Sequence, residues 1–137
     1  MKVAYALSFA FAALAISGCA QGGAQGGNVQ TEGGMQGIAL EFLYLQNCTY
    51  CTQYMPAVEN AVGRFGGQVR LAVLDASLRN QDAQMAAKYG QYKKAGLFGG
   101  FPTLVANGNK SLVGLRSEEE VVDWLCGQFS QKPSACG

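Results

Sequence analysis

Residues 38–51 read IALEFLYLQNCTYC, and this stretch decides the fold. Its first part, residues 38–45, is apolar at nearly every position, which is typical of a strand buried on both faces of a sheet. The run ends on Cys48 and Cys51, and an amphipathic helix is predicted to follow directly. Two thiols in one turn at the start of a helix can form a disulfide with each other, and the helix N-terminus favours the reactive thiolate. The stretch therefore predicts thiol–disulfide exchange.

The next elements follow from apolar periodicity and turn residues. The helix after the cysteines has one apolar stripe and is predicted to end at Gly66-Gly67. A second strand is predicted over 69–74, and a second helix over 81–89 with Gly90 as its stop. Residues 91–100 are predicted to be an irregular connecting segment beside the cysteines. The stripe of the first helix consists of Tyr54, Val58, Ala61, Val62 and Phe65.

The C-terminal third predicts a hairpin and a closing helix. Asn107-Gly108 lies between the short apolar runs 103–106 and 111–113, which is a strong hairpin signal. Ser117 and Glu120 have the spacing of a capping box, so we expect the last helix to begin there. Its buried stripe is predicted to be Val121, Trp124, Leu125 and Phe129. The element order βαβαββα predicts an α/β fold with a central mixed sheet of about four strands flanked by helices.

With this order and the cysteine pair on a strand–helix junction, residues 38–129 resemble the thioredoxin-like superfamily. The matching motifs are Cys48-x-x-Cys51, Pro56, Lys88-Tyr89-Gly90, Phe101-Pro102-Thr103 and Val113-Gly114-x-x-Ser117. The resemblance implies that Cys48 attacks a partner disulfide and that Cys51 resolves the mixed disulfide. It also implies a cis peptide bond before Pro102, with the backbone of Phe101 pairing with an extended substrate; the alternative is an ordinary trans turn.

The chain departs from the thioredoxin pattern near the cysteines. Asn47 stands where thioredoxin has Trp, and Thr49-Tyr50 replaces Gly-Pro. In having Tyr at this position, the chain resembles glutaredoxin. Tyr50 is the aromatic residue placed to contact a partner. Phe42 stands where thioredoxin buries an acidic residue, which leaves the proton acceptor for Cys51 open. Glu41 is adjacent, but strand alternation directs it to the other face.

The other cysteines predict a disulfide and an anchor. The chain has five cysteines, an odd number for an exported protein. If Cys19 is modified, Cys126 and Cys136 remain as a second pair, which we expect to be a structural disulfide that pins the tail rather than a second redox pair. A zinc site shared by the four sulfurs is disfavoured, because Cys126 and Cys136 lie ten positions apart, unlike compact zinc-ribbon spacing.

The N-terminus predicts export. Lys2, an apolar stretch over 3–16 and small residues before Cys19 have the order of a signal segment, and the stretch is too short to span a bilayer. Ile16-Ser17-Gly18-Cys19 resembles the lipobox of bacterial lipoproteins, which implies that residues 1–18 are removed and Cys19 is lipidated. The alternative is an ordinary signal cut nearby, with Cys19 incidental. Residues 19–37 are Gly-rich and predict a flexible tether for a domain over 38–137.

Composition narrows the function classes. Without residues 1–18 the chain has nine basic residues (ten in the whole chain, less Lys2) and nine acidic ones. The sequence has no basic stripe that would predict nucleic-acid binding. We also expect no cofactor and no metal. The chain has no histidine, which excludes His–Cys nucleophile pairs and histidine-based acid–base catalysis.

The sequence therefore predicts an exported thiol–disulfide oxidoreductase of a bacterial cell envelope. We expect it to be lipid-anchored in the periplasm, at the outer membrane in a Gram-negative cell because Ala20 rather than Asp follows Cys19. Its partners would be protein thiols and disulfides and a membrane or soluble redox partner. Reductase, oxidase and isomerase share the Cys-x-x-Cys motif, so the motif leaves the direction open. The alternative function is a non-catalytic binding module or a dedicated electron relay.

Overall fold

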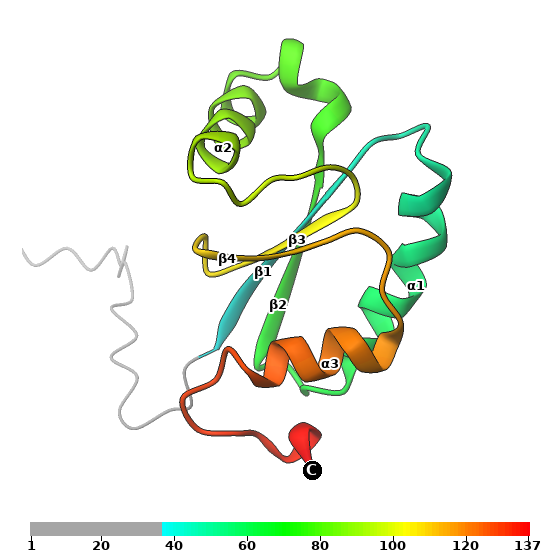
Figure 1. Ribbon diagram of the computed structural model, residues 1–137, viewed down its shortest axis with the longest axis vertical. Coiled ribbons are helices and arrows are strands. Elements are labelled where there is room, and N and C mark those ends of the chain that lie inside the picture. Colours follow the sequence, from blue (N-terminus) through cyan, green and yellow to red (C-terminus); the bar gives the residue numbers. More distant parts are fainter. Residues whose placement is uncertain (1–36) are drawn as a thin grey trace, which may run out of the picture. The chain divides into compact units, whose positions relative to one another are not determined.

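A computed structural model describes residues 37–137 of the chain (Figure 1). The predicted signal segment 1–18, Cys19 and all of the tether before Gly37 lie outside the described residues. Within residues 37–137, no helix combines the length and apolar character needed to cross a bilayer.

Four strands form one mixed sheet in the order β2-β1-β3-β4. Strand β1 (Ile38–Tyr44) pairs in parallel with β2 (Val69–Asp75) and antiparallel with β3 (Thr103–Ala106), which in turn pairs antiparallel with β4 (Lys110–Val113). A parallel pair requires a crossover connection, and helix α1 (Thr49–Gly63) supplies it between β1 and β2. The predicted mixed sheet of about four strands and the element order βαβαββα are confirmed.

The helices cover the two faces of the sheet unequally. Helices α1 and α3 (Glu118–Cys126) pack against one face, and α2 (Ala83–Lys94) lies on the other (Figure 1). The larger core therefore lies under α1 and α3 and contains Ile38, Leu40 and Phe42 of β1. On the α2 face Leu43 is buried, whereas Ala39 is exposed. The prediction that β1 is buried on both faces is thus correct only for its C-terminal half.

The predicted end of the second helix at Gly90 is wrong. Helix α2 begins after its N-cap Asp82 and continues through Gly90 to Lys94, so residues 91–94 are helical rather than part of a loop. The reason is tertiary: Tyr92 is 2 % exposed and its hydroxyl donates to Glu41 of β1, which also pairs with Lys88. These contacts hold the last turn of α2 on the sheet and outweigh the low helix propensity of one glycine.

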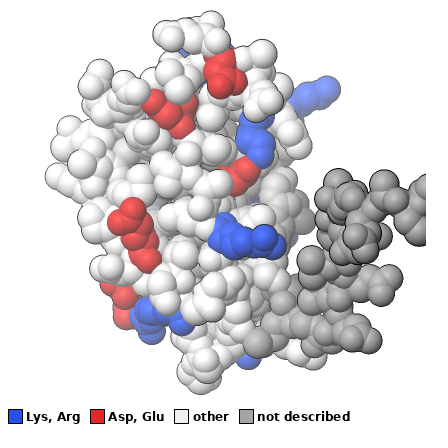
Figure 2. Space-filling view, turned by 180° about the vertical axis from the view of Figure 1, so that it is seen from behind, with Lys and Arg blue, Asp and Glu red and all other residues white. Residues whose placement is uncertain are grey.

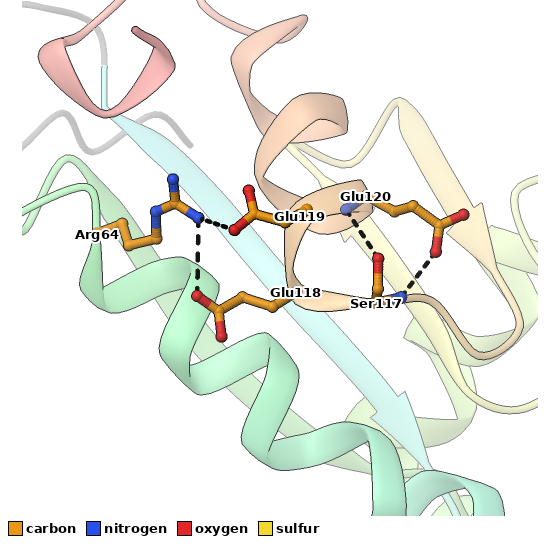
Figure 3. A network of polar contacts seen from close by, with 5 residues as sticks. All are labelled: Arg64, Ser117, Glu118, Glu119 and Glu120. Atoms are coloured by element: carbon orange, nitrogen blue, oxygen red, sulfur yellow. Dashed lines mark hydrogen bonds and ion pairs between the residues drawn. The ribbon is translucent and has the colours of Figure 1, made fainter.

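Helix α1 ends at Gly63, before its predicted stop at Gly66-Gly67, whereas the predicted start of α3 is confirmed. Ser117 is the N-cap of α3, and its capping box with Glu120 is present (Figure 3). Beside it, Arg64 at the end of α1 pairs with Glu118 and Glu119 at 3.7 and 2.8 Å, which joins the two helices that share the main core (Figure 3).

The predicted stripe of α3 is confirmed only in part. Val121 and Leu125 are fully buried, as expected, but Trp124 and Phe129 are half-exposed and pack at the margin of the core. The helix ends at Cys126, so Phe129 follows it in the tail and stacks on Phe65 with ring centroids 5.6 Å apart.

The hairpin between β3 and β4 is also confirmed. Asn107 and Gly108 both have positive φ, 50° and 68°, as a tight turn requires. The side chain of Asn107 accepts from the N–H of Ala39 at 2.9 Å, and its own N–H donates to the carbonyl of Ala39. The turn therefore extends the sheet by one further pair of contacts to β1.

We expect Gly90→Ala to raise the free energy of unfolding by about 0.5–1 kcal/mol, because Gly90 lies inside a helix and faces open space. The matched control is Gly96→Ala. Gly96 has φ +70°, so its substitution is expected to destabilise by about 1 kcal/mol. Denaturant unfolding with the disulfides intact measures both, and a destabilising Gly90→Ala would contradict the helical assignment.

Candidate functional site: a disulfide at the start of helix α1

Cys48 is the residue on which helix α1 begins. After β1 the chain turns, with the N–H of Cys48 donating to the carbonyl of Leu45, and Cys48 then takes the extended N-cap conformation. The sulfur of Cys48 accepts a hydrogen bond from the N–H of Cys51 at 3.1 Å. The same two residues are joined by a disulfide, with their Cα atoms 5.2 Å apart. The site thus combines a disulfide with a backbone donor already directed at one of its sulfurs.

The two cysteines differ sharply in exposure. Cys48 is half-exposed, and the residues between the cysteines, including Tyr50 at 64 %, are exposed. Cys51 is 1 % exposed and belongs to the main core. Of the two cysteines, Cys48 is therefore the one more open to an incoming thiolate. When the bond opens, the N–H of Cys51 and the helix N-terminus remain to stabilise the thiolate of Cys48.

Aromatic rings fill the space under α1. Phe42 is fully buried, as is Tyr54, and their rings meet edge to face with centroids 5.8 Å apart. Burial raises the pKa of Tyr54, Glu120 adding to that shift and Arg116 opposing it, so this phenol stays protonated at neutral pH. Glu41 lies on the opposite face, held by Lys88 and Tyr92. Neither Tyr54 nor Glu41 is thus placed as the proton acceptor for Cys51.

Phe101 and Pro102 lie at the same end of the strands as the cysteine pair. Leu43 pairs with Thr103, so Pro102 comes opposite the end of β1 from which the chain runs to Cys48. The Phe101–Pro102 peptide bond is cis, as the resemblance implies. The carbonyl of Pro102 is taken by the N–H of Gly114. Within residues 37–137, by contrast, the backbone N–H and C=O of Phe101 form no hydrogen bond.

The loop that precedes Cys48 is fastened to the segment after β2. Asp75 accepts from the N–H of Ser77 at 2.9 Å and from the side-chain amide of Gln46 at 2.7 Å. The hydroxyl oxygen of Ser77 accepts from the N–H of Gln46 at 3.0 Å. We refer to Gln46, Asp75 and Ser77 as the polar latch. It holds a short 3₁₀ helix, η1 (Ala76–Asn80), beside the cysteine loop.

Cys126 and Cys136 form a second disulfide away from this edge. It joins the last residue of α3 to the C-terminal 3₁₀ turn η2 (Ser134–Cys136), with Cα atoms 5.7 Å apart. Figure 1 shows the C-terminal turn at the end of the domain opposite the start of α1. Cys126 is 8 % exposed and packs in the core. These positions fit the expected structural role, which stays a prediction.

The structure brings together Cys48 and Cys51, and places Phe101 and Pro102 at the same edge, with Tyr50 on the surface beside them. Cys126 and Cys136 lie elsewhere, and Cys19 lies outside the described residues. Sequence reasoning missed η1 and the polar latch. The spacing Asp75-x-Ser77 is an N-cap signal that indicates a turn after β2, but nothing in it names Gln46 as the partner.

We expect Asp75→Asn to destabilise the protein in a pH-dependent way. Burial, the largest influence, raises the pKa of Asp75, but the hydrogen bonds from Ser77 and Gln46 together outweigh it and hold this pKa below its usual value. The carboxylate therefore stabilises the folded state above the unfolded pKa of about 3.9, and this contribution is lost as the pH falls through the folded pKa.

Thermal unfolding of wild type and Asp75→Asn from pH 7 to pH 3 measures this effect. The gap between them should be modest, because Asp75 is near the surface, and should narrow progressively as the pH falls below about 4. Gln46→Ala should reproduce part of the loss at pH 7. A gap that stays constant over the whole pH range would contradict the role given to the carboxylate.

Comparisons with known proteins found similar solved structures but no similar sequence. No protein-family model matches the sequence, and no curated protein sequence matches it. Among solved structures, the chain is similar to thioredoxin-2 of the malaria parasite, with 15% identity over 65% of this chain and 81% of that one, at a TM-score of 0.47. It is similar to a glutaredoxin from Methanosarcina mazei Go1, with 19% identity over 66% of this chain and 79% of that one, at 0.49.

A third similar structure is human ERp44, with 22% identity over 69% of this chain and 28% of that one, at a TM-score of 0.49. At such identities no functional conclusion follows from the likeness. The strand order β2-β1-β3-β4, the α1 crossover and the flanking helices are those of the thioredoxin-like architecture. Residues 37–137 have a thioredoxin-like fold, with a Cys-x-x-Cys disulfide at the start of its first helix.

Proposed function

We propose that the protein is a thiol–disulfide oxidoreductase that acts on protein disulfides or dithiols through Cys48 and Cys51. The asymmetry of that disulfide carries the proposal. One sulfur is at the surface and hydrogen-bonded at a helix start, and the other is buried in the core behind it. A purely structural bond here would contribute little, since a loop this short constrains the unfolded chain only weakly.

The exchange runs in two steps. In the reduced protein, the thiolate of Cys48 attacks one sulfur of a substrate disulfide; that bond breaks, and the other substrate sulfur leaves as a thiolate. Cys51 then attacks the sulfur of Cys48, which closes the Cys48–Cys51 bond and releases the second substrate sulfur. Two electrons pass from the protein dithiol to the substrate. The same steps in reverse oxidise a substrate dithiol.

Phe101 supports the choice of a polypeptide substrate. Its backbone N–H and C=O have no hydrogen-bond partner in residues 37–137. They lie at the same end of the strands as Cys48. An extended chain bound there would pair with this backbone, as a strand pairs with a sheet edge. Tyr50, exposed between the two cysteines, offers an apolar contact to the same chain.

A second candidate function is an electron relay to one dedicated partner, or a binding module that uses the fold without turnover. The packing of Phe42 and Tyr54 favours it, because no carboxylate stands in their place to take the proton of Cys51. Resolution of the mixed disulfide would then be slow with general substrates.

We expect Cys48→Ser to reduce insulin-disulfide reduction and dithiol oxidation to the uncatalysed rate, since the attacking sulfur is gone. The measurement uses the purified full chain, with Cys136→Ser as the control that removes a cysteine away from the site. Wild-type activity no greater than that of Cys48→Ser would refute the enzyme proposal.

The variant Cys51→Ser separates the two candidates, because it retains the attacking thiol and blocks its release. Many trapped mixed-disulfide partners in cells indicate a general enzyme, and a single one indicates a dedicated relay. If no mixed-disulfide partner is trapped, the remaining hypothesis is the non-catalytic binding module.

We also propose that the domain acts within a bacterial cell envelope. It would be anchored through a lipid on Cys19 and connected to it by residues 19–37. The supporting observations are the order of residues 1–19 and the Gly-rich composition of the tether.

Cys19→Ser is expected to abolish incorporation of labelled fatty acid when the full chain is produced in a bacterium. Cys48→Ser is the matched control and should keep the label, because it leaves the lipobox intact. A wild-type chain without label, or a labelled Cys19→Ser chain, would rule out lipidation of Cys19.

A further inference from the structure

We propose that Arg79 selects polypeptide substrates with an acidic residue next to the reacting disulfide, by binding its carboxylate in a hollow beside Cys48. This inference rests on the proposed function and names a substrate class for the same site.

The hollow adjoins the reactive cysteine. It has a volume of about 340 Å³, enough for a side chain. The cysteine loop forms one side and η1 the other, and the polar latch holds the two sides together. Its lining is mostly polar and uncharged apart from one arginine: Leu45, Asn47, Cys48, Ser77, Arg79 and Asn80. A group bound here lies next to the sulfur of Cys48.

Arg79 is held in place before any ligand binds. Its Nη1 donates to the carbonyl of Ala76 at 2.8 Å, and its guanidinium lies over the ring of Tyr89, 5.5 Å from the ring centre. Tyr89 in turn stacks with Phe101, at 6.3 Å between ring centres. A guanidinium has five N–H donors, so most of those of Arg79 remain to bind a carboxylate. Because the side chain is already ordered, less entropy is lost on binding.

The positive charge of Arg79 is not neutralised by an ion pair in the described part of the chain. The ion pairs within residues 37–137 join Arg64 to Glu118 and Glu119, and Lys88 to Glu41. Asp75, the acid at the start of η1, does not line the hollow and directs its oxygens to Ser77 and Gln46. The hollow therefore presents one cation without a resident anion.

Charge elsewhere on the surface is mixed. Figure 2 shows Lys and Arg as small groups interspersed with Asp and Glu, separated by uncharged surface, over the face it presents. A substrate approaching that face meets no large field of one sign. Arg79 offers a local charged contact instead, because it lines the same hollow as Cys48.

Arg79 has a second possible effect, which the experiment must separate. A cation near Cys48 also stabilises the thiolate of that cysteine, and this would change the rates with all disulfides together. Selection of a carboxylate changes instead the ratio between acidic and neutral disulfides. The ratio is therefore the readout, and the rate with a neutral disulfide reports folding and thiolate reactivity.

The experiment measures second-order rate constants of the reduced full chain with three small disulfides of similar size. Dithiodipropionate is anionic, bis(2-hydroxyethyl) disulfide is neutral and cystamine is cationic. Each rate is divided by the rate of the same disulfide with dithiothreitol, which removes differences between the leaving thiols. For wild type we expect this relative rate for dithiodipropionate to exceed that for the neutral disulfide by about three- to five-fold, the size of an exposed ion pair, with cystamine lowest. The preference should shrink as salt is added.

The variants test the assignment to one residue. Arg79→Gln should bring the anionic-to-neutral ratio close to one, Arg79→Lys should retain part of it, and Arg79→Glu should invert it. The matched control is Arg70→Gln. Arg70 is exposed on β2 and pairs with Ala39, at the end of β1 away from Cys48, so its loss should leave the ratio unchanged.

A peptide disulfide with Glu, Gln or Lys beside one cysteine then tests the polypeptide claim, with the same order of rates expected. If the peptides show no such order, the polypeptide claim is refuted. A wild type that reduces the neutral disulfide but shows no charge preference overturns the role of Arg79 and leaves the proposed function standing. If none of the disulfides is reduced, the proposed function fails and this inference with it.

Discussion

The burial of Cys51 against β1 is the contact on which the site depends. Cys51 lies in the same core as Phe42 and Tyr54, so the first turn of α1 is fixed on the sheet. Cys48, one turn earlier, then has to lie at the surface, at the edge where β1 ends. A helix that shifted along the sheet would bury both sulfurs or expose both. The difference in exposure between the two cysteines is therefore a consequence of core packing.

The same packing determines how protons can move. Phe42 and Tyr54 occupy the space under α1, and burial raises the pKa of Tyr54, so this phenol does not accept a proton near neutral pH. The carboxylate of Glu41 is on the other face and engaged by Lys88. In the proposed exchange, water or the departing substrate thiolate is left to take the proton of Cys51. This chain thus uses its buried aromatic pair for stability where an acid would serve catalysis.

Features that depend on neighbouring residues could be predicted from the sequence, and features that depend on distant contacts could not. The Cys48–Cys51 junction, the Asn107-Gly108 turn and the Ser117 capping box are written within a few residues, and all three are present. Gly90 misled the prediction of α2, because the contact of Tyr92 with Glu41 spans 51 positions and has no local signal. The hollow was missed for the same reason, since its two sides meet through Gln46 and Asp75, 29 positions apart.

The rings of Tyr89, Phe98 and Phe101 form a cluster that connects Arg79 with the Phe101 backbone. Tyr89 supports the guanidinium of Arg79 on one side, and on the other it packs with Phe98 and Phe101, whose backbone faces the expected substrate chain. Phe98 and Phe101 meet at 4.8 Å, which closes the cluster. The groups proposed to bind the substrate backbone and its neighbouring side chain therefore rest on the same rings. A change in this cluster would move both contacts together, while the sulfur pair, fixed by the core under α1, would stay in place.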